Sequence, residues 1–209
     1  ALELGQMFRR FGAAVTILER SAQLLAHGYE PEMGLALAQV LAEEGVQIVT
    51  AAAVKRVRLG GTEVVASADV GGRVEEFRAE KLLIATGRRP NTDTIAIERA
   101  GVSLSAEGEV EVDEFLRTNV PHIFAAGDAI GRLVGSQMAT PVGSRDGRIA
   151  AYNALSGEPP RRVGHRVIPR VIFTDPQAAM VGFTEEAAVK AGHRCWCNTL
   201  PMSLVPRAG

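Results

Sequence analysis

Two carboxylates stand where a nucleotide-binding sheet would place its ligand contacts. Glu19 closes the apolar run "AAVTILE" (residues 13–19), and Asp128 follows Gly127 directly after "HIFAA". In open α/β sheets, ligands bind at the carboxyl ends of the strands. A carboxylate there accepts hydrogen bonds from ribose or other polyol hydroxyls, and a glycine lets a ligand approach the backbone. Both positions are therefore candidate binding sites.

Glu19 also bears on the kind of nucleotide. A carboxylate at the end of the second strand of a nucleotide-binding unit accepts from the adenosine ribose and repels a 2′-phosphate, which favours NADH. Arg20, directly after it, could pair with that phosphate. The pattern therefore leaves NADH and NADPH both open. The alternative interpretation is a solvated charge pair at a strand end.

The surroundings of Asp128 also allow two interpretations. An Asp after a strand is common as a plain turn or N-cap residue. The stretch "ATPVGSRDGRIAAYNAL", however, predicts a helix over residues 140–155, with Thr140 and Pro141 suited to its cap and first turn. The amides at its N-terminus would present partial positive charge to an electron-rich ring.

The elements that must position these residues follow an α/β order. Apolar spacing predicts helices over residues 1–12 and 31–44, ending at Gly12 and Gly45, and short β-branched runs predict strands over 13–19 and 46–50. This order indicates a doubly wound sheet. Three antiparallel strands are expected over 53–60, 62–70 and 73–87, the last of them buried, and a further buried strand over 123–126. Another strand and helix follow Val167.

Two Gly- and Pro-rich stretches, "GRRPNTD" and "SGEPPRR", mark domain boundaries. We therefore expect three segments, over residues 1–86, 87–158 and 159–209.

The composition excludes several classes of function. The net charge is -1, from 23 basic and 24 acidic residues, so nothing suggests nucleic acid or an anionic membrane as a partner. No apolar run approaches the ~20 residues of a membrane span, and no signal peptide is recognisable, so a cytoplasmic protein is expected. Cys195 and Cys197 flank a tryptophan and match no zinc pattern; we expect small buried hydrophobes rather than metal ligands. Ordinary surface roles are expected of all histidines (His27, His122, His165 and His193).

Four motifs in order carry a resemblance: "KLLIATGRRPN", "TNVPHIFAAGDAIG", "ATPVGSRDGRIAAYNAL" and "VIFTDPQAAMVGFTEEAAVKAG". Together they resemble the flavin- and pyridine-nucleotide-dependent disulfide oxidoreductases, which implies FAD and either NADPH or NADH as cofactors. The resemblance implies an NAD(P)-binding domain over residues 1–86, without its first strand and glycine loop, the C-terminal part of an FAD-binding domain over 87–158, and the start of an α+β interface or dimerisation domain over 159–209. The resemblance implies that the first helix follows a glycine-rich loop outside this chain. It also implies cofactor contacts, with Glu3 near the nicotinamide, Glu19 and Arg20 near the adenosine ribose, Gly87 at the domain crossover, Gly127 and Asp128 at the flavin ribityl chain, and Ala139 and Thr140 at the pyrimidine end of the flavin. For Glu3, an exposed carboxylate on a helix is the plain alternative.

Within the family, the last motif and "LVPRAG" resemble the mercuric reductases, although residues 129–137 form a longer loop than in those proteins. The implied activity passes electrons from NAD(P)H through FAD and a cysteine pair to Hg(II), giving Hg(0). A disulfide substrate, as for dihydrolipoyl dehydrogenase or glutathione reductase, is the alternative. The redox cysteine pair and the family's catalytic histidine are not in this sequence, so no catalytic residue is assigned. We expect a homodimer for the full-length chain, and an isolated 209-residue piece that is at most a nucleotide-binding or interaction module.

Overall fold

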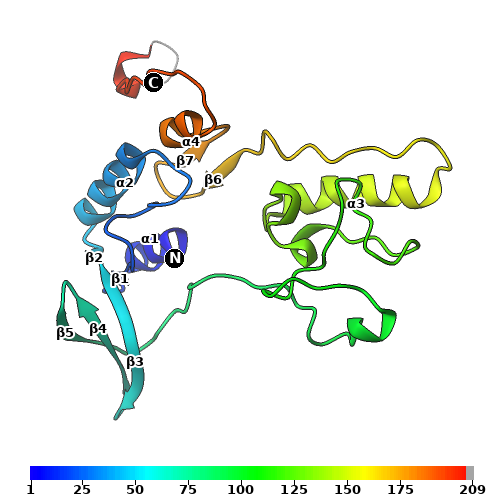
Figure 1. Cartoon of the computed structure of the whole chain (residues 1–209). Coiled ribbons are helices and arrows are strands. Elements are labelled where there is room, and N and C mark those ends of the chain that lie inside the picture. Colours follow the sequence, from blue (N-terminus) through cyan, green and yellow to red (C-terminus); the bar gives the residue numbers. More distant parts are fainter. Residues whose placement is uncertain (206–209) are drawn as a thin grey trace. The chain divides into compact units, whose positions relative to one another are not determined.

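The computed structural model describes residues 1–205 and divides the chain into two compact units (Figure 1). Unit 1 consists of Ala1–Ile84 together with Pro169–Gly209, and unit 2 consists of Ala85–Ile168. Residues 206–209 lie outside the described part, so most of the predicted "LVPRAG" similarity is not described. The α/β class is confirmed.

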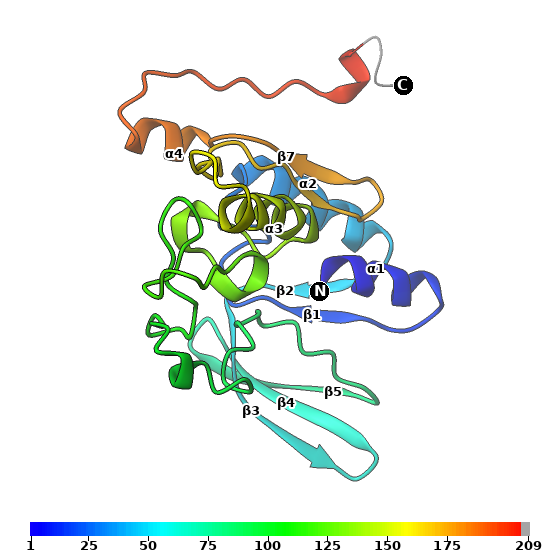
Figure 2. The same ribbon diagram turned by 90° about the vertical axis from the view of Figure 1, so that its right-hand side faces the viewer.

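Unit 1 begins with the predicted alternation of helix and strand. Its first elements are α1 (Leu2–Arg10), β1 (Thr16–Leu18), α2 (Pro31–Glu43) and β2 (Gln47–Val49). Both helices end before a glycine with positive φ, 93° at Gly12 and 85° at Gly45, as expected of helix stops. β1 and β2 pair in parallel, with Ile17 opposite Ile48, and Figure 2 shows the two strands side by side. This pair is the parallel sheet expected of a doubly wound domain.

Three antiparallel strands follow in unit 1: β3 (Ala52–Gly60), β4 (Glu63–Val70) and β5 (Arg73–Ala79). The Gly61 and Gly71–Gly72 turns have positive φ, which fits tight hairpin connections. The prediction of a buried last strand is wrong. β5 is largely exposed, and residues 80–84 form no strand, because Ala79 already pairs with Val64 near the start of β4 and further ladder partners on β4 run out.

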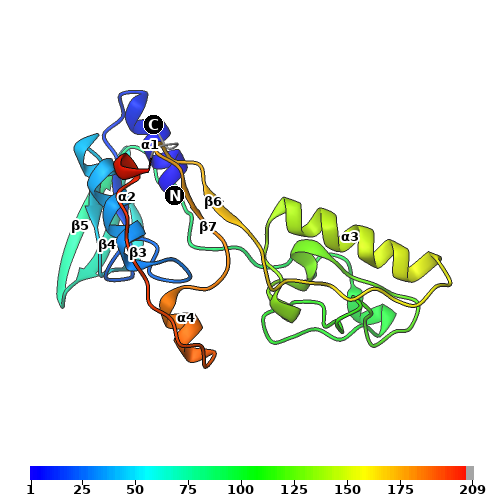
Figure 3. The ribbon, with the colours of Figure 1, turned by 90° about the horizontal axis from the view of Figure 1, so that it is seen from above.

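The end of the described chain completes the core of unit 1. The hairpin of β6 (Arg170–Ile172) and β7 (Ala178–Met180) is followed by α4 (Glu185–Lys190) and the short η4 (Met202–Leu204). Ala178 and Ile172 join an apolar cluster with Leu37 and Leu41 of α2. Figure 3 shows this hairpin beside α1 and α2. Segments from both ends of the sequence therefore share one core.

Unit 2 has one long helix, α3 (Thr140–Leu155), and three short 3₁₀ turns, η1 (Ile97–Ala100), η2 (Gly127–Ile130) and η3 (Leu133–Gly135), among its described residues. The predicted strand over 123–126 is wrong: these residues are half-buried, and a single bridge pairs Phe124 with Arg117. One bridge is too few backbone partners for a ladder. Helix α3 is confirmed, but Ala139 rather than Thr140 is its N-cap, and no side chain caps it.

The segment after α3 packs on unit 2 before the chain returns to unit 1. The backbone N–H of Arg161 donates to Asn153 Oδ1 at 2.7 Å, and the guanidinium of Arg161 lies 3.6 Å from the centroid of the Tyr152 ring. Val163 donates its N–H to Glu114 O at 2.9 Å. Unit 2 thus extends to Ile168. Within residues 1–205, no helix is long and apolar enough to cross a membrane.

Candidate cofactor sites

In unit 1, Glu19 directly follows β1 and is held in place by backbone groups. Its N–H donates to Val49 O at 2.8 Å, and its Oε1 accepts from the N–H of Ser21 at 2.7 Å. A carboxylate has about four lone-pair sites, so acceptor capacity remains for a hydroxyl. Arg20 beside it is exposed. The geometry fits a ribose contact at the carboxyl end of a parallel strand.

Glu3 lies on the exposed side of α1 and already has a partner within unit 1. Its Oε1 accepts from the backbone N–H of Phe173 at 2.7 Å. This contact gives the carboxylate a structural task that the sequence did not indicate. The nicotinamide contact of Glu3 stays a prediction, and it requires the second carboxylate oxygen or a change of partner.

Two further side chains of α1, those of Gln6 and Arg10, contact Asp175 in the β6–β7 turn. Buried Gln6 accepts from Asp175 N at 2.8 Å and donates to Asp175 O at 2.7 Å. Arg10 pairs with Glu44 Oε1 at 2.6 Å and with the Asp175 carboxylate at 2.9 Å. The hydrogen bond from Arg10 lowers the pKa of Glu44. Positions 3, 6 and 10 thus fasten α1 to residues 173–175 over successive helical turns.

In unit 2, Gly127 and Asp128 begin the η2 turn, which packs against α3. Gly127 is buried with a φ of 67°, and a Cβ there would come within 3.3 Å of the Gly143 Cα. A larger residue at position 127 would therefore press on the helix and adopt a strained backbone. Glycine at both positions keeps Asp128 close to the first turns of α3.

Arg88 joins Asp128 to the start of α3. Its guanidinium pairs with Asp128 Oδ2, and its Nη1 donates to Met138 O at 3.1 Å. Ala139 and Thr140 follow directly, with Thr140 exposed. An arginine that was not predicted thus joins the predicted Asp128 to Met138, the residue directly before the predicted Ala139 and Thr140. Arg88 directly follows Gly87, an exposed glycine with a φ of 127°, in "GRRPN", but that motif does not indicate its partner 40 positions later.

The prediction of a surface role for His165 is wrong. Its side chain is 3% exposed and contacts the Asp146 carboxylate of α3, whose side chain is 1% exposed, at 2.8 and 2.9 Å. His27, His122 and His193 are exposed, as predicted. No local pattern could have revealed the pair, because it joins residues 19 positions apart.

The expectation for the cysteines is wrong in part. Residues 193–200 form no helix or strand, Cys195 is half-buried, and Cys197 is exposed rather than buried. Local desolvation and then the charges of Glu185 and Glu30 raise the pKa of the Cys197 thiol. A raised pKa disfavours the thiolate, which is the form that binds metal ions. Among the described residues, no group of three or more His, Cys, Asp or Glu side chains gathers as a metal site would require.

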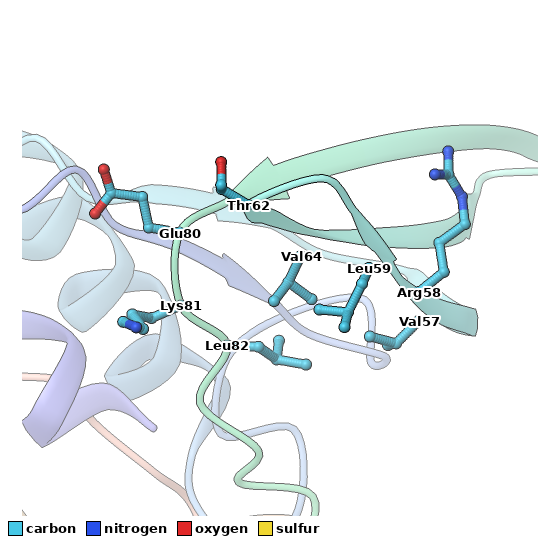
Figure 4. Close-up of a pocket in the computed structure, with 8 residues that line it drawn as sticks. All are labelled: Val57, Arg58, Leu59, Thr62, Val64, Glu80, Lys81 and Leu82. Carbon is cyan, nitrogen blue, oxygen red and sulfur yellow. The ribbon is translucent and has the colours of Figure 1, made fainter.

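A pocket of about 570 Å³ lies elsewhere in unit 1, between the β3–β4 hairpin and residues 80–82. Figure 4 shows the apolar side chains of Val57, Leu59, Val64 and Leu82 gathered on one side of this hairpin. None of the predicted cofactor residues lines the pocket. The candidate cofactor sites therefore lie at Glu19 and Asp128 and their neighbours, and not in this pocket.

Comparisons with known proteins were made over the whole chain. Residues 1–150 match the family described as "Pyridine nucleotide-disulphide oxidoreductase", and residues 168–209 match its dimerisation domain. The mercuric reductase of Staphylococcus aureus is 38% identical over 208 residues, a match that spans essentially the whole of this chain and 37% of that protein. The dihydrolipoyl dehydrogenase of Geobacillus stearothermophilus is 36% identical over 91% of this chain and 39% of its own length.

Among solved structures, the HOCl-induced flavoprotein disulfide reductase RclA from Escherichia coli superposes with a TM-score of 0.83 at 32% identity. The match covers 99% of this chain and 45% of that one. The chain thus spans less than half the length of each of these relatives.

Proposed function

From the premise that the chain belongs to the pyridine nucleotide-disulphide oxidoreductase family, whose cofactors are FAD and NAD(P)H, we propose that the full-length protein reduces Hg(II) to Hg(0). The hydride of NAD(P)H supplies two electrons, which pass through FAD and a cysteine pair to the metal, and NAD(P)⁺ and a proton are released. The observation that carries the proposal is the similarity over the whole chain to proteins named mercuric reductase, at 38% and 37% identity.

The residues of this chain would bind and orient the cofactors, while FAD, when bound, supplies the electron relay. Asp128 would accept from the ribityl hydroxyls, beside the close approach at Gly127, and Ala139 and Thr140 would approach the flavin ring. Gly87 would adjoin the cofactor at the crossover. Glu3 would face the nicotinamide, with Glu19 and Arg20 at the adenosine ribose. The fixed carboxylate of Glu19 and the Arg88-bound carboxylate of Asp128 support these roles.

The organisation of the full-length protein is also proposed. Residues 1–86 would belong to the NAD(P) domain, 87–158 to the FAD domain and 159–209 to the interface domain. The match of residues 168–209 to a dimerisation domain supports a homodimer. We place the protein in the cytoplasm, where reduced nicotinamide cofactors are available.

The decisive experiment is NAD(P)H oxidation by the purified full-length protein with Hg(II)–thiol complexes as acceptor. We expect stimulation of oxidation and release of Hg(0) vapour. NADPH and NADH are compared in the same assay. Absence of stimulation by mercury would contradict the proposal.

A second function is favoured by two of the relatives, the dihydrolipoyl dehydrogenase and the flavoprotein disulfide reductase. In this alternative, the same cofactors reduce a disulfide. Lipoamide and glutathione disulfide in the same assay separate the two functions. Faster NAD(P)H oxidation with a disulfide than with mercury would identify a disulfide reductase.

A further inference from the structure

The feature that the proposed cofactor contacts leave unexplained is the buried cluster around His165 in unit 2. His165 Nε2 lies 2.8 Å from Asp146 Oδ1, and its Nδ1 lies 2.9 Å from Val134 O. The hydroxyl of Ser136, also buried, donates to Asp146 Oδ2 at 3.3 Å. One imidazole, in the segment after α3, therefore contacts both α3 and the loop over residues 131–139 that contains η3, called the η3 loop below.

The partners of His165 determine where its protons lie. A carbonyl oxygen only accepts, so Nδ1 carries a proton toward Val134. The contact between Nε2 and the carboxylate needs a second proton between them, since two lone pairs would otherwise face each other. The cluster thus holds two protons, and every polar atom named has a partner, as a buried polar network requires.

The loop held by His165 is strained. Val134 has a φ of 48°, which is rare for a β-branched residue, and Gly135 follows with a φ of 77°. A Cβ at Gly135 would lie 3.4 Å from the His165 Cβ, so the start of the His165 side chain lies close to the loop. Such a conformation persists where surrounding contacts determine it. Here the contact is the hydrogen bond from His165 to the Val134 carbonyl.

One part of the cluster lies, in sequence, between residues proposed to contact the flavin. The η3 loop connects Asp128 to Ala139, and Asp146 stands on α3 less than two turns after Thr140. Arg145, the neighbour of Asp146, donates to Gly164 O at 3.0 Å and holds the backbone before His165. Two successive α3 side chains therefore fix the segment that presents the imidazole to the loop.

We infer that His165 is a positioning residue for flavin binding. By joining Asp146 to Val134, it fixes the η3 loop and with it the approach of residues 139–140 to the flavin. The inference rests on the proposed flavin contacts of Asp128, Ala139 and Thr140. It assigns His165 no contact with the cofactor.

The test compares FAD binding by variants of the full-length protein, freed of FAD and titrated with it while flavin fluorescence is followed. We expect His165→Ala to weaken FAD binding about 10- to 100-fold, the range for a lost buried hydrogen-bond partner. The absorption spectrum of the remaining bound flavin should also shift, since the protein surroundings of the ring change. His122→Ala, which removes an exposed histidine of the same unit, is the matched control and should bind FAD as the wild type does.

Asp146→Asn is the conservative variant. Its amide nitrogen can donate to Nε2 of a neutral ring while its oxygen accepts from Ser136, so His165 and Ser136 each keep one hydrogen bond without the charge. We expect FAD affinity within about 3-fold of the wild type, because a change of that size is smaller than the free energy expected for the loss of one hydrogen bond. If His165→Ala fails to fold, His165→Gln keeps a donor toward Asp146, loses only the Val134 contact, and should still weaken FAD binding.

Wild-type affinity and spectrum in the His165 variants would overturn the inference, and so would an Asp146→Asn variant as impaired as His165→Ala. Failure of the proposed function gives a different result. In that case, the wild-type protein would still bind FAD, but Hg(II) would not stimulate its NAD(P)H oxidation.

Discussion

The two units of the molecule differ in the polarity of their buried residues. Each unit surrounds an apolar cluster: α2, β1 and the β6–β7 hairpin contribute to the one in unit 1, and Val110, Leu116 and Ile130 belong to the one in unit 2. Unit 2 has a smaller share of regular structure, and among the described residues most of the buried polar ones lie there (Thr92, Thr118, Ser136 and Asp146, against Gln6 and Thr174 in unit 1). Apolar packing tolerates small displacements, whereas a buried hydrogen bond fixes a loop at one distance. The unit with more loops thus adds more of the directional interactions to its apolar core.

The largest effect should come from removing the carboxylate at the centre of unit 2. Asp146→Ala leaves His165 buried without its partner, which should cost about 3–5 kcal/mol of unfolding free energy. Hydrogen exchange of the full-length protein should show lost protection in residues 85–168. Equal loss of hydrogen-exchange protection in both units would contradict the expectation that this hydrogen-bonded cluster stabilises unit 2 in particular.

The corresponding change in unit 1 is Leu41→Ala. Leu41 is fully buried in the apolar cluster, so its truncation should cost about 2–5 kcal/mol. Protection should now fall in unit 1. Leu59→Ala, at a side chain 78% exposed, is the control and should change stability by less than about 0.5 kcal/mol.

Substitutions in the two units should weaken the binding of different cofactors. Asp128→Ala should weaken FAD binding about 10- to 100-fold, because the proposed acceptor for the ribityl hydroxyls is lost, and leave nicotinamide nucleotide binding unchanged. Glu19→Ala should weaken nicotinamide nucleotide binding and leave FAD binding unchanged. Titration of each variant with FAD and with NAD(P)H measures both affinities, and a parallel loss of both would contradict separate sites.

A smaller effect on stability is expected in unit 1 when the pH is lowered. Arg10 lowers the folded-state pKa of Glu44, so the pair contributes stability above the unfolded pKa of about 4.3, and this contribution is lost as the pH falls through the folded value. Glu44→Gln should therefore reduce the slope of stability against pH below about 4.3. Urea unfolding at a series of pH values measures it. Glu32→Gln, at an exposed carboxylate of α2, should keep the wild-type slope.

The smallest effect should come from the exposed pair of Arg89 and Asp93 in unit 2, whose side chains are 81% and 57% exposed. Asp93→Ala should change unfolding free energy by less than about 0.5 kcal/mol. A change of several kcal/mol in thermal or urea unfolding would show that surface pairs, and not only buried ones, hold unit 2.

The sequence predicted those features of the fold that depend on local pattern. Apolar spacing and a following glycine were enough for α1 and α2, and the Gly-rich turns were enough for the β3–β5 hairpins. The pattern failed at residues 80–84 and 123–126, which have the composition of buried strands. A strand requires backbone partners from other segments, and composition does not reveal whether they are present.

The same limit applies to the candidate sites. Glu19 and Asp128 were recognised because each ends an apolar run, and the structure gives each a fixed place. Arg88 and His165 were missed as contributors because their roles come from partners 40 and 19 positions away. Side chains that support a site, unlike those expected to contact the ligand, leave no spacing pattern in the sequence.

The attachment of α1 to residues 173–175 has a consequence for the order of events during synthesis. Glu3 and Gln6 bind backbone groups 169–170 positions later in the chain. At roughly 5–20 residues per second, a ribosome needs on the order of ten to thirty seconds to reach those partners. Unit 2 is meanwhile complete in sequence. Helix α1 therefore obtains these contacts only after all of unit 2 has been synthesised.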